Sequence, residues 1–482
     1  MAAAAAGRQR VAGLAAGLAA AVAGGAGARQ EGEREGWAPA LGEWLQEQGA
    51  RMPGVAVKPS GSGLGLLASG QPGGRVRWLK FWRWGKEEAL AEFPLASAIT
   101  AQTVAADPDV GELYSKWLDL GILNERQVVV MFLLTERAKG SASSWAPYIQ
   151  ALPSSHDIPL FLSDRALSEL KGTSLEHAAA TQRQEVDDEW RIMAPLAADA
   201  LNQGGAGALQ LSQQDFQWAR ATYWSRALAL GQGEHGPEGL VPGLDFANHA
   251  PLDRSKARWK VDEQANSVKL LGVPSKRNSE ITISYGDKSN EELMFMYGFA
   301  IRDNPDDKLM VPPPLPADTS QWDASASKRM NLVQQAGEDA RSFLPRRGAQ
   351  TRQQARDTVE SVLPKLQAFV MDDRELSVAR DKPEVLTEKV SDGERRFATL
   401  TLLSSMLESK VNELEGATGS AANDESLLSS GTLDRRRSNC VVYRLGQKEL
   451  AKSYLSAAKE MLREAQEQRG SSVGSPASAA AA

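Results

Sequence analysis

The chain has 482 residues, a formal net charge of −6 and 24% charged residues, so it has room for two or three domains and a large core. The acidic balance excludes a general nucleic-acid binder, whose phosphate contacts need a basic face. The single cysteine, Cys440, excludes an internal disulfide and a cysteine-rich zinc cluster, and four histidines offer a catalytic metal few ligands.

The N-terminal stretch, residues 1–36, is rich in alanine and glycine, and its first thirty residues contain three arginines and no acidic residue. A basic, acid-free start of low complexity is typical of an organelle targeting segment. A secretory signal peptide and a disordered tail without an address are the alternatives. The uncharged run at residues 11–28 is too weakly hydrophobic to predict a stable membrane span.

The folded part begins near Trp37, with a short strand predicted at residues 55–57 and a glycine-rich stretch at 61–68. Residues 63–68 fit the dinucleotide-binding pattern G-x-G-x-x-A, but that pattern requires a helix to open at the glycines. The run Ser-Gly-Gln-Pro-Gly-Gly at 69–74 cannot be helical, so we reject a dinucleotide fold and a Rossmann-type methyltransferase. The glycines are best explained by a turn, although they also let a backbone approach a ligand closely.

Basic and aromatic residues alternate at 75–84, which predicts a strand with its aromatic side chains inward; a nucleic-acid stacking surface is the alternative. Residues 108–232 are predicted to be mostly helical, because their apolar residues recur at helical spacing. This block ends in a helix predicted at 215–230. Strands return at 267–271 and 281–285, so the helices are expected to form an insertion in a β domain and not a βαβ series.

The motifs that carry chemistry follow this block. Asp245 is followed by Asn248 and His249, and the apolar alternation of residues 281–285 points the ring of Tyr285 inward. Taken alone, Asp245 and His249 could be two metal ligands, but no third histidine or cysteine lies nearby in the sequence. Tyr285 alone could be an ordinary core tyrosine with a satisfied hydroxyl.

A short helix is predicted to start at Ser289, which forms a capping box with Glu292. The helix is predicted to end at Gly298, because glycine adopts the left-handed conformation without a Cβ clash. This helix and its exit deliver Tyr297 and Phe299 to the same region.

A proline-rich boundary at residues 311–316 precedes further helices. Apolar stripes predict one helix over residues 397–407 and another over 450–462. The polar, glycine- and serine-rich residues 416–431 are predicted to be a flexible loop, and the tail from residue 470 is of low complexity.

In this order, the glycine turn, the helical insert with Ser225-Arg226, the Asp-x-x-Asn-His motif and the Tyr-Gly and Tyr-Gly-Phe motifs resemble the SET-domain protein methyltransferases. The resemblance is to the subgroup typified by the Rubisco large-subunit lysine methyltransferase, and it runs from about residue 55 to residue 467. Shorter matches support that subgroup: Ser144-Trp145 with Leu152-Pro153, and residues 169–173, 288–293 and 443–450. Residues 71–82 look like an insertion, and Trp259 stands near the place where a channel-lining tyrosine is expected.

The resemblance implies an α+β fold. A SET domain of small β-sheets, with a helical insertion and a knot-like C-terminal crossing, is followed by an all-α substrate-binding domain. The implied domains are a transit peptide or disordered segment at 1–36, the SET domain at 37–315 with its insert at about 108–232, the helical domain at 316–469 and a disordered tail at 470–482.

The resemblance also implies S-adenosylmethionine as cofactor and a lysine side chain of a protein as acceptor. The implied catalytic residue is Tyr285. Cofactor contacts are implied for Ser62, Gly63, Leu64, Gly65, Arg226, Asn248, His249 and Phe299. Substrate contacts are implied for Arg226, Asp245, Tyr285 and Tyr297, and no metal site is expected.

The implied function is methylation of a lysine on a non-histone protein, with the Rubisco large subunit and plastid fructose-bisphosphate aldolase as candidate substrates. A protein-histidine methyltransferase of the same subgroup and a catalytically inactive binding module are the alternatives. The chain is expected to act as a monomer in the chloroplast stroma, with the cytoplasm as the alternative location. Neither nucleic acid nor stable membrane insertion is expected.

Overall fold

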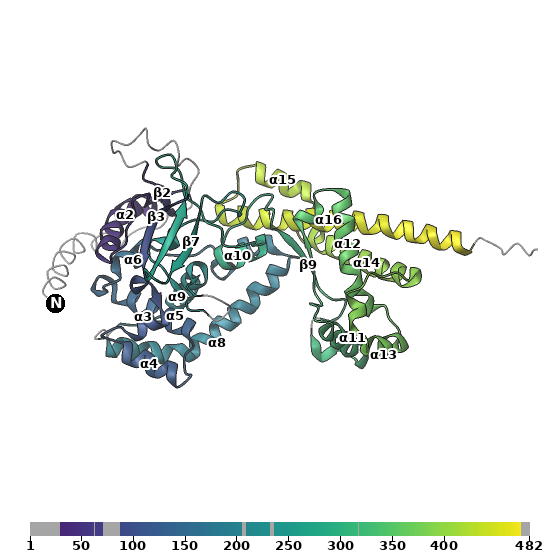
Figure 1. The fold of residues 1–482 in the computed structure, drawn as a ribbon, viewed down its shortest axis with the longest axis horizontal. Helices are drawn as coiled ribbons and strands as arrows, with labels where there is room; N and C mark the ends of the chain where they lie inside the picture. The colour runs from purple at the N-terminus through teal and green to yellow at the C-terminus, as the bar shows by residue number, and fades with distance from the viewer. Residues whose placement is uncertain are drawn as a thin grey trace, which may run out of the picture. The chain divides into compact units, whose positions relative to one another are not determined.

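The computed structural model describes residues 29–61, 63–70, 87–204, 209–231, 236–316 and 318–473 (Figure 1). The chain divides into two compact units, one of residues 1–156 and 182–287 and the other of residues 157–181 and 288–482. Its described part combines helices with small antiparallel sheets, which confirms the predicted α+β class. The predictions for residues 1–28, Ser62, residues 71–86 and the end of the tail lie outside the described residues.

Small antiparallel sheets dominate the strand content of the first unit. A hairpin pairs β1 with β2, a three-stranded sheet has the order β3-β8-β7, and a second three-stranded sheet has the order β4-β6-β5. Their bounds are β1 Val55–Ser60, β2 Gly63–Ala68, β3 Glu88–Pro94, β4 Ile99–Thr100, β5 Leu228–Ala229, β6 Glu238–Leu240, β7 Ala257–Asp262 and β8 Ser267–Gly272. The strands predicted at residues 55–57 and 267–271 are therefore confirmed.

The block predicted to be helical contains most of the helices of the first unit. The helices are α2 Arg29–Glu47, α3 Ala101–Ala105, α4 Gly111–Asp119, α5 Glu125–Lys139, α6 Ala146–Ala151, α8 Ser174–Gln203 and α9 Gln213–Arg226. Helix α8 belongs to the second unit up to Thr181. Helix α5 begins at an Asn124–Gln127 capping box and buries every residue from Val128 to Glu136, so it is a core helix.

The helix predicted at residues 215–230 is too long. Helix α9 ends at Arg226, Ala227 is extended, and β5 then pairs with β6. The backbone groups after Arg226 find partners in a strand that is close only in the folded chain. Periodicity along the sequence carries no information about that partner.

The strand predicted at residues 281–285 is wrong, because the backbone of residues 280–285 makes only isolated bridges. Glu280 lies opposite Leu67 of β2, and Ile283 lies beside His249. The Ile281 N–H donates to the Leu66 carbonyl, and the Ile283 N–H donates to the carbonyl of Asn248. The predicted alternation nevertheless holds, because Ile281 and Ile283 are buried.

The second unit is mainly helical, with one two-stranded antiparallel sheet of β9 and β10. Its elements are α7 Asp164–Leu167, α10 Asn290–Tyr297, β9 Lys308–Val311, α11 Ala324–Gln335, β10 Ser342–Pro345, α12 Arg352–Leu366, α13 Asp373–Arg380, α14 Gly393–Thr418, α15 Ala421–Ser429 and α16 Arg435–Val473. Helices α12, α14 and α16 pack together (Figure 1). Their shared core includes Leu403, Leu407 and Leu450. Both predicted apolar stripes are thus confirmed as buried helix faces.

The flexible loop predicted at residues 416–431 is wrong. Helix α14 continues to Thr418, and Ser420 caps the short helix α15. The polar Asp424 on α15 is buried and bonds to Arg444 and Lys448 of α16, so charge pairing across helices holds a segment whose composition is typical of a loop.

The domain boundary at residue 315 stays a prediction, whereas the compact division falls after Asp287. None of the helices described here has the length and apolar character needed to cross a membrane.

Candidate active site

Gly61 lies in a turn, but Gly63 and Gly65 lie in strand β2 and not in the predicted turn. We keep the name glycine turn for these three glycines, and the β2 backbone approaches the Asn-His motif. Gly63 has a φ of +128°, and a methyl group on Gly65 would lie 2.9 Å from Glu280 Oε1 and 3.0 Å from Asn248 Nδ2. Only glycine therefore lets the β2 backbone come this close. Because these glycines lie in a strand and open no helix, the rejection of the dinucleotide pattern is confirmed.

Asn248, His249 and Tyr285 lie together, as the sequence order predicts. The Tyr285 backbone N–H donates to His249 Nδ1 at 3.0 Å, and the Tyr285 hydroxyl donates to the Ala247 carbonyl at 2.7 Å. Since Nδ1 accepts a hydrogen bond, a neutral His249 carries its proton on Nε2. The two rings lie 5.0 Å apart between centroids. This set of contacts fixes the direction of the tyrosine hydroxyl.

Asp245 and Arg226 also lie together, but the carboxylate is enclosed. The Asp245 side chain is 0% exposed and that of Arg226 is 15% exposed. The Tyr148 hydroxyl donates to Asp245 Oδ2 at 2.7 Å, and the Gly243 N–H donates to Oδ1 at 3.1 Å. Arg226 Nη1 donates to the Asp245 carbonyl at 2.8 Å, and its guanidinium lies over the ring of Phe246.

Burial dominates the electrostatics of this group. Burial raises the pKa of Asp245, while Arg226 and the Tyr148 hydroxyl act against that rise. Burial also raises the pKa of Tyr148 well above its usual value. Asp245 is thus placed to position Arg226, and a direct contact of its carboxylate with a substrate stays a prediction. Tyr148 had no predicted role: it lies between the matched dipeptides Ser144-Trp145 and Leu152-Pro153, and no local signal shows that it meets Asp245.

Tyr297 and Phe299 belong to the second unit, so their approach to Tyr285 stays a prediction. Their own element is as predicted: Ser289 and Glu292 form the capping box of α10, and Gly298 ends it with a φ of +78°. Their ring centroids lie 6.3 Å apart, and burial raises the pKa of Tyr297. In the first unit, Trp259 is half-buried on β7.

The buried residue His156 should make the stability of the protein depend on pH. His156 Nε2 lies 2.9 Å from Thr222 Oγ1, and burial, together with Arg226 and Arg137, lowers the pKa of His156 to about 3. Between pH 6.5 and about 3 the unfolded chain binds a proton at this residue that the folded chain does not bind. The free energy of unfolding should therefore fall as the pH falls through this window, by about 1.4 kcal/mol per pH unit for one proton.

Urea unfolding of the wild type and of His156→Gln between pH 7 and pH 4 measures this contribution. The variant keeps a polar group near Thr222, but this group does not titrate. Its unfolding free energy should therefore fall less steeply with pH than that of the wild type, by the contribution of about one bound proton, or about 1.4 kcal/mol per pH unit. Equal slopes for the two proteins would show that His156 is charged in the folded state or does not control stability.

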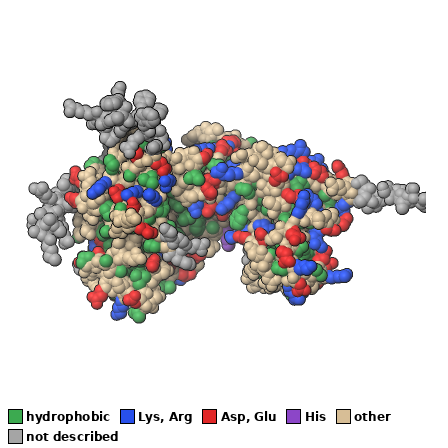
Figure 2. All heavy atoms as spheres, viewed as in Figure 1, with side chains coloured by type: hydrophobic (Ala, Val, Ile, Leu, Met, Phe, Trp, Pro, Cys, Tyr) green, Lys and Arg blue, Asp and Glu red, His purple; other side chains and the backbone are tan. Residues whose placement is uncertain are grey.

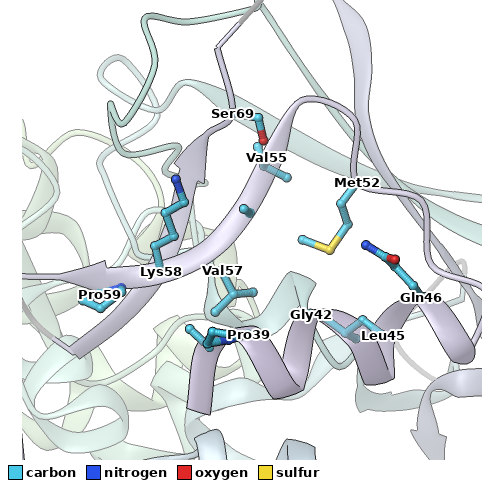
Figure 3. Close-up of a pocket in the computed structure, with 12 residues that line it drawn as sticks. Pro39, Gly42, Leu45, Gln46, Met52, Val55, Val57, Lys58, Pro59 and Ser69 are labelled. Carbon is cyan, nitrogen blue, oxygen red and sulfur yellow. The ribbon is translucent and has the colours of Figure 1, made fainter. Parts of the chain in front are cut away.

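A separate pocket of about 570 Å³ lies between α2 and β1. Figure 3 shows Pro39, Gly42 and Leu45 of the helix on one side and Val55 and Val57 of the strand on the other. None of the predicted site residues among those described lines it. Nor do the described residues include a group of three or more His, Cys, Asp or Glu side chains that could hold a metal ion.

The described helices and small sheets have the arrangement of a SET-domain fold. The structure of Rubisco LSMT bound to AdoMet superposes with a TM-score of 0.67 at 20% identity, over 91% of this chain and 96% of that one. The SET domain of LSMT bound to lysine and AdoHcy gives a TM-score of 0.68 at 20% identity, over 89% and 93% of the two chains. The chain therefore has the fold of the family that its motifs resemble. This confirms the predicted SET architecture with a helical C-terminal region.

Two kinds of curated relative are similar in sequence. One is a fructose-bisphosphate aldolase–lysine N-methyltransferase, chloroplastic, of Arabidopsis thaliana, with 28% identity over 55% of this chain and 52% of the relative. The other is the actin-histidine N-methyltransferase of Gallus gallus, with 26% identity over 58% and 45%. The matched part spans about half the length of each relative. No protein-family profile matches the chain.

Proposed function

We propose that this chain is an S-adenosylmethionine-dependent protein methyltransferase that modifies a lysine side chain. The proposal rests on one observation: His249 and Tyr285 are hydrogen-bonded to each other, and Asn248 packs against the glycine turn at Gly65. The β2 backbone at Gly65 packs directly against the side chains of Asn248 and Glu280, so the glycine-rich stretch and the Asn-His motif lie side by side, as a shared cofactor site requires. The AdoMet and AdoHcy named for the structural neighbours support the choice of cofactor.

The residues of the chain have defined roles in this proposal. Gly63, Leu64 and Gly65 line the cofactor with Asn248 and His249, and Ser62 is assigned to the same turn by resemblance. Arg226 pairs with the cofactor carboxylate and Phe299 stacks near the adenine. Tyr285 and Tyr297 form the walls of the lysine channel, with Asp245 and Arg226 near its mouth.

Bound there, S-adenosylmethionine would supply a methyl group already activated on a sulfonium, so the protein mainly has to align the acceptor and exclude water. The lysine must arrive as a neutral amine, and an apolar channel beside a positive charge lowers its pKa, because desolvation and like charge both disfavour the ammonium. Tyr285, whose hydroxyl donates to the Ala247 carbonyl, keeps lone pairs that can accept from the amine. Aromatic walls also tolerate a methylated cation.

A protein-histidine methyltransferase is the second candidate, because the actin-histidine relatives match the chain about as well as the lysine-directed one. A catalytically inactive binding module is the third. Incubating a lysate with the enzyme and isotope-labelled S-adenosylmethionine, followed by mass spectrometry, separates them. We expect label on lysine. Label on histidine would favour the second candidate, and no label would contradict both enzymatic ones.

The proposed substrates are the Rubisco large subunit and fructose-bisphosphate aldolase. The name of a structural neighbour includes Rubisco, and the name of one relative includes the aldolase. The helical region at about 317–468 would recognise the intact protein, since a broad helical surface can bind a partner beyond the modified lysine. Figure 2 shows acidic and basic side chains interspersed over the visible face of the C-terminal helices. Lys448 is wholly buried, so it is unsuited to a surface test.

Reversing the exposed charges Lys459 and Arg463 on α16 tests this recognition. The double Glu variant should methylate the intact protein several-fold more slowly and a short lysine peptide at the normal rate. Equal loss on both substrates would indicate a damaged fold, and no loss on either would show that this face does not select the substrate.

The proposed location is the chloroplast stroma, supported by the basic start of the chain and by the chloroplastic relative. Residues 1–36 fused to a fluorescent reporter should direct it to plastids in plant or algal cells. A cytosolic or secreted reporter would contradict this location.

A further inference from the structure

We infer that Glu280 is a positioning residue that sets the orientation of the Asn248 side-chain amide and thereby aims its carbonyl oxygen at the ammonium group of the cofactor. This inference rests on the proposed function and deepens it. Glu280 had no role in the analysis of the sequence.

Two side chains donate hydrogen bonds to the same carboxylate oxygen of Glu280. Asn248 Nδ2 donates to Glu280 Oε1 at 2.6 Å, and Ser60 Oγ donates to the same oxygen at 2.7 Å. A methyl group on Gly65 would lie within 3.0 Å of this oxygen, of Asn248 Nδ2 and of Ser60 Cβ. The hydrogen-bonded group therefore packs directly against the backbone of the glycine turn.

The backbones of the two partners are held as firmly as their side chains. Glu280 lies opposite Leu67 of β2, and the Ile281 N–H that follows it donates to the Leu66 carbonyl at 2.7 Å. The Asn248 carbonyl accepts from the Ile283 N–H at 3.0 Å. These backbone hydrogen bonds fix the positions from which the two side chains extend toward each other.

The chemistry of the carboxylate decides which way the amide points. An ionised carboxylate only accepts hydrogen bonds, so the edge of Asn248 that faces Glu280 must be its NH2 group. The carbonyl oxygen of the same planar amide is then directed away from Glu280. A carbonyl oxygen held in this way accepts from an ammonium group, whereas an amide turned over would present its NH2 group and repel it.

The test compares two ligands on three variants. Glu280→Met removes the acceptor while keeping the length of the side chain, and Glu280→Gln keeps an oxygen that can accept from Asn248. S-adenosylhomocysteine carries the ammonium group, and 5′-methylthioadenosine lacks the whole amino-acid part. Glu263→Gln, at an exposed carboxylate in the β7–β8 turn, serves as a matched control. Calorimetry gives the Kd of each ligand for each protein. A thermal melt of each protein shows whether the variant is folded.

We expect Glu280→Met to weaken the binding of S-adenosylhomocysteine about tenfold. Without Glu280 the Asn248 amide is no longer held in place, and the charge-assisted hydrogen bond from the ligand's ammonium group to the Asn248 carbonyl oxygen is lost. Its affinity for 5′-methylthioadenosine should stay within about twofold of the wild type, and Glu280→Gln should recover most of the loss. Equal weakening for both ligands, or no weakening for S-adenosylhomocysteine, would overturn the role of Glu280. A wild-type chain that binds neither ligand would instead contradict the proposed function itself.

Discussion

Replacing Tyr285 with phenylalanine should lower the rate of methyl transfer by about a hundredfold or more and leave cofactor affinity nearly unchanged. The hydroxyl is the only part of the side chain that is lost, and in the structure it is aimed by its bond to the Ala247 carbonyl and by the contact of the ring with His249. The acceptor amine would lose the group that orients it in the transition state, while the glycine turn and Asn248 keep their geometry.

Tyr223→Phe is the matched control, because the Tyr223 hydroxyl also makes one hydrogen bond, to Glu238 Oε2 at 2.9 Å, in the same unit. Losing that bond should cost stability and leave the rate per folded molecule near normal. Turnover and cofactor Kd are measured on both variants, with rates divided by the folded fraction. A Tyr285→Phe enzyme with near-normal turnover would remove Tyr285 from the catalytic role.

Asp424→Asn should destabilise the second unit by about 3–5 kcal/mol, because it leaves the buried ammonium group of Lys448 without its anion. The Asp424 and Lys448 side chains are both 0% exposed, and Lys448 Nζ lies 2.7 Å from Asp424 Oδ2. Arg444 donates to Asp424 Oδ1 at 2.7 Å. Burial lowers the pKa of Lys448, which shows how unfavourable the charge is at this position without a partner. Urea unfolding measured by circular dichroism gives the change.

The neighbouring Glu425→Gln is the control for this prediction. Glu425 pairs with Arg302, but both side chains are well exposed, so its loss should cost at most about 1 kcal/mol. Replacing Asp424 by Leu together with Lys448 by Met should recover part of the stability, since a buried ion pair and an apolar pair are often close in free energy. Equal, small effects of Asp424→Asn and Glu425→Gln would show that the buried pairing does not stabilise α15.

Local features of the sequence predicted much of the site. The capping box of α10 and its end at Gly298 depend on neighbours within one or two turns, and the structure has both. The burial of Ile281 and Ile283 follows from alternation alone. The order of the motifs indicated the SET fold because family motifs keep their order along the chain even where identity is low.

The predictions that failed concern partners far away in the sequence. Residues 416–431 have the composition of a loop, but the charges of Arg444 and Lys448 on α16 hold them as a helix. The predicted helix at 215–230 ends at Arg226 because β6 offers backbone partners to Leu228–Ala229.

The sequence by itself determined the elements with local signals and the identity of the chemical groups at the glycine turn, the Asn-His motif and Tyr285. Only the tertiary structure decided which groups share a hydrogen bond: Tyr148 with Asp245, separated by 97 residues, and Ser60 with Glu280, separated by 220. Such pairs leave no periodic or capping signal, because their free energy depends on burial and geometry that arise only when distant segments pack.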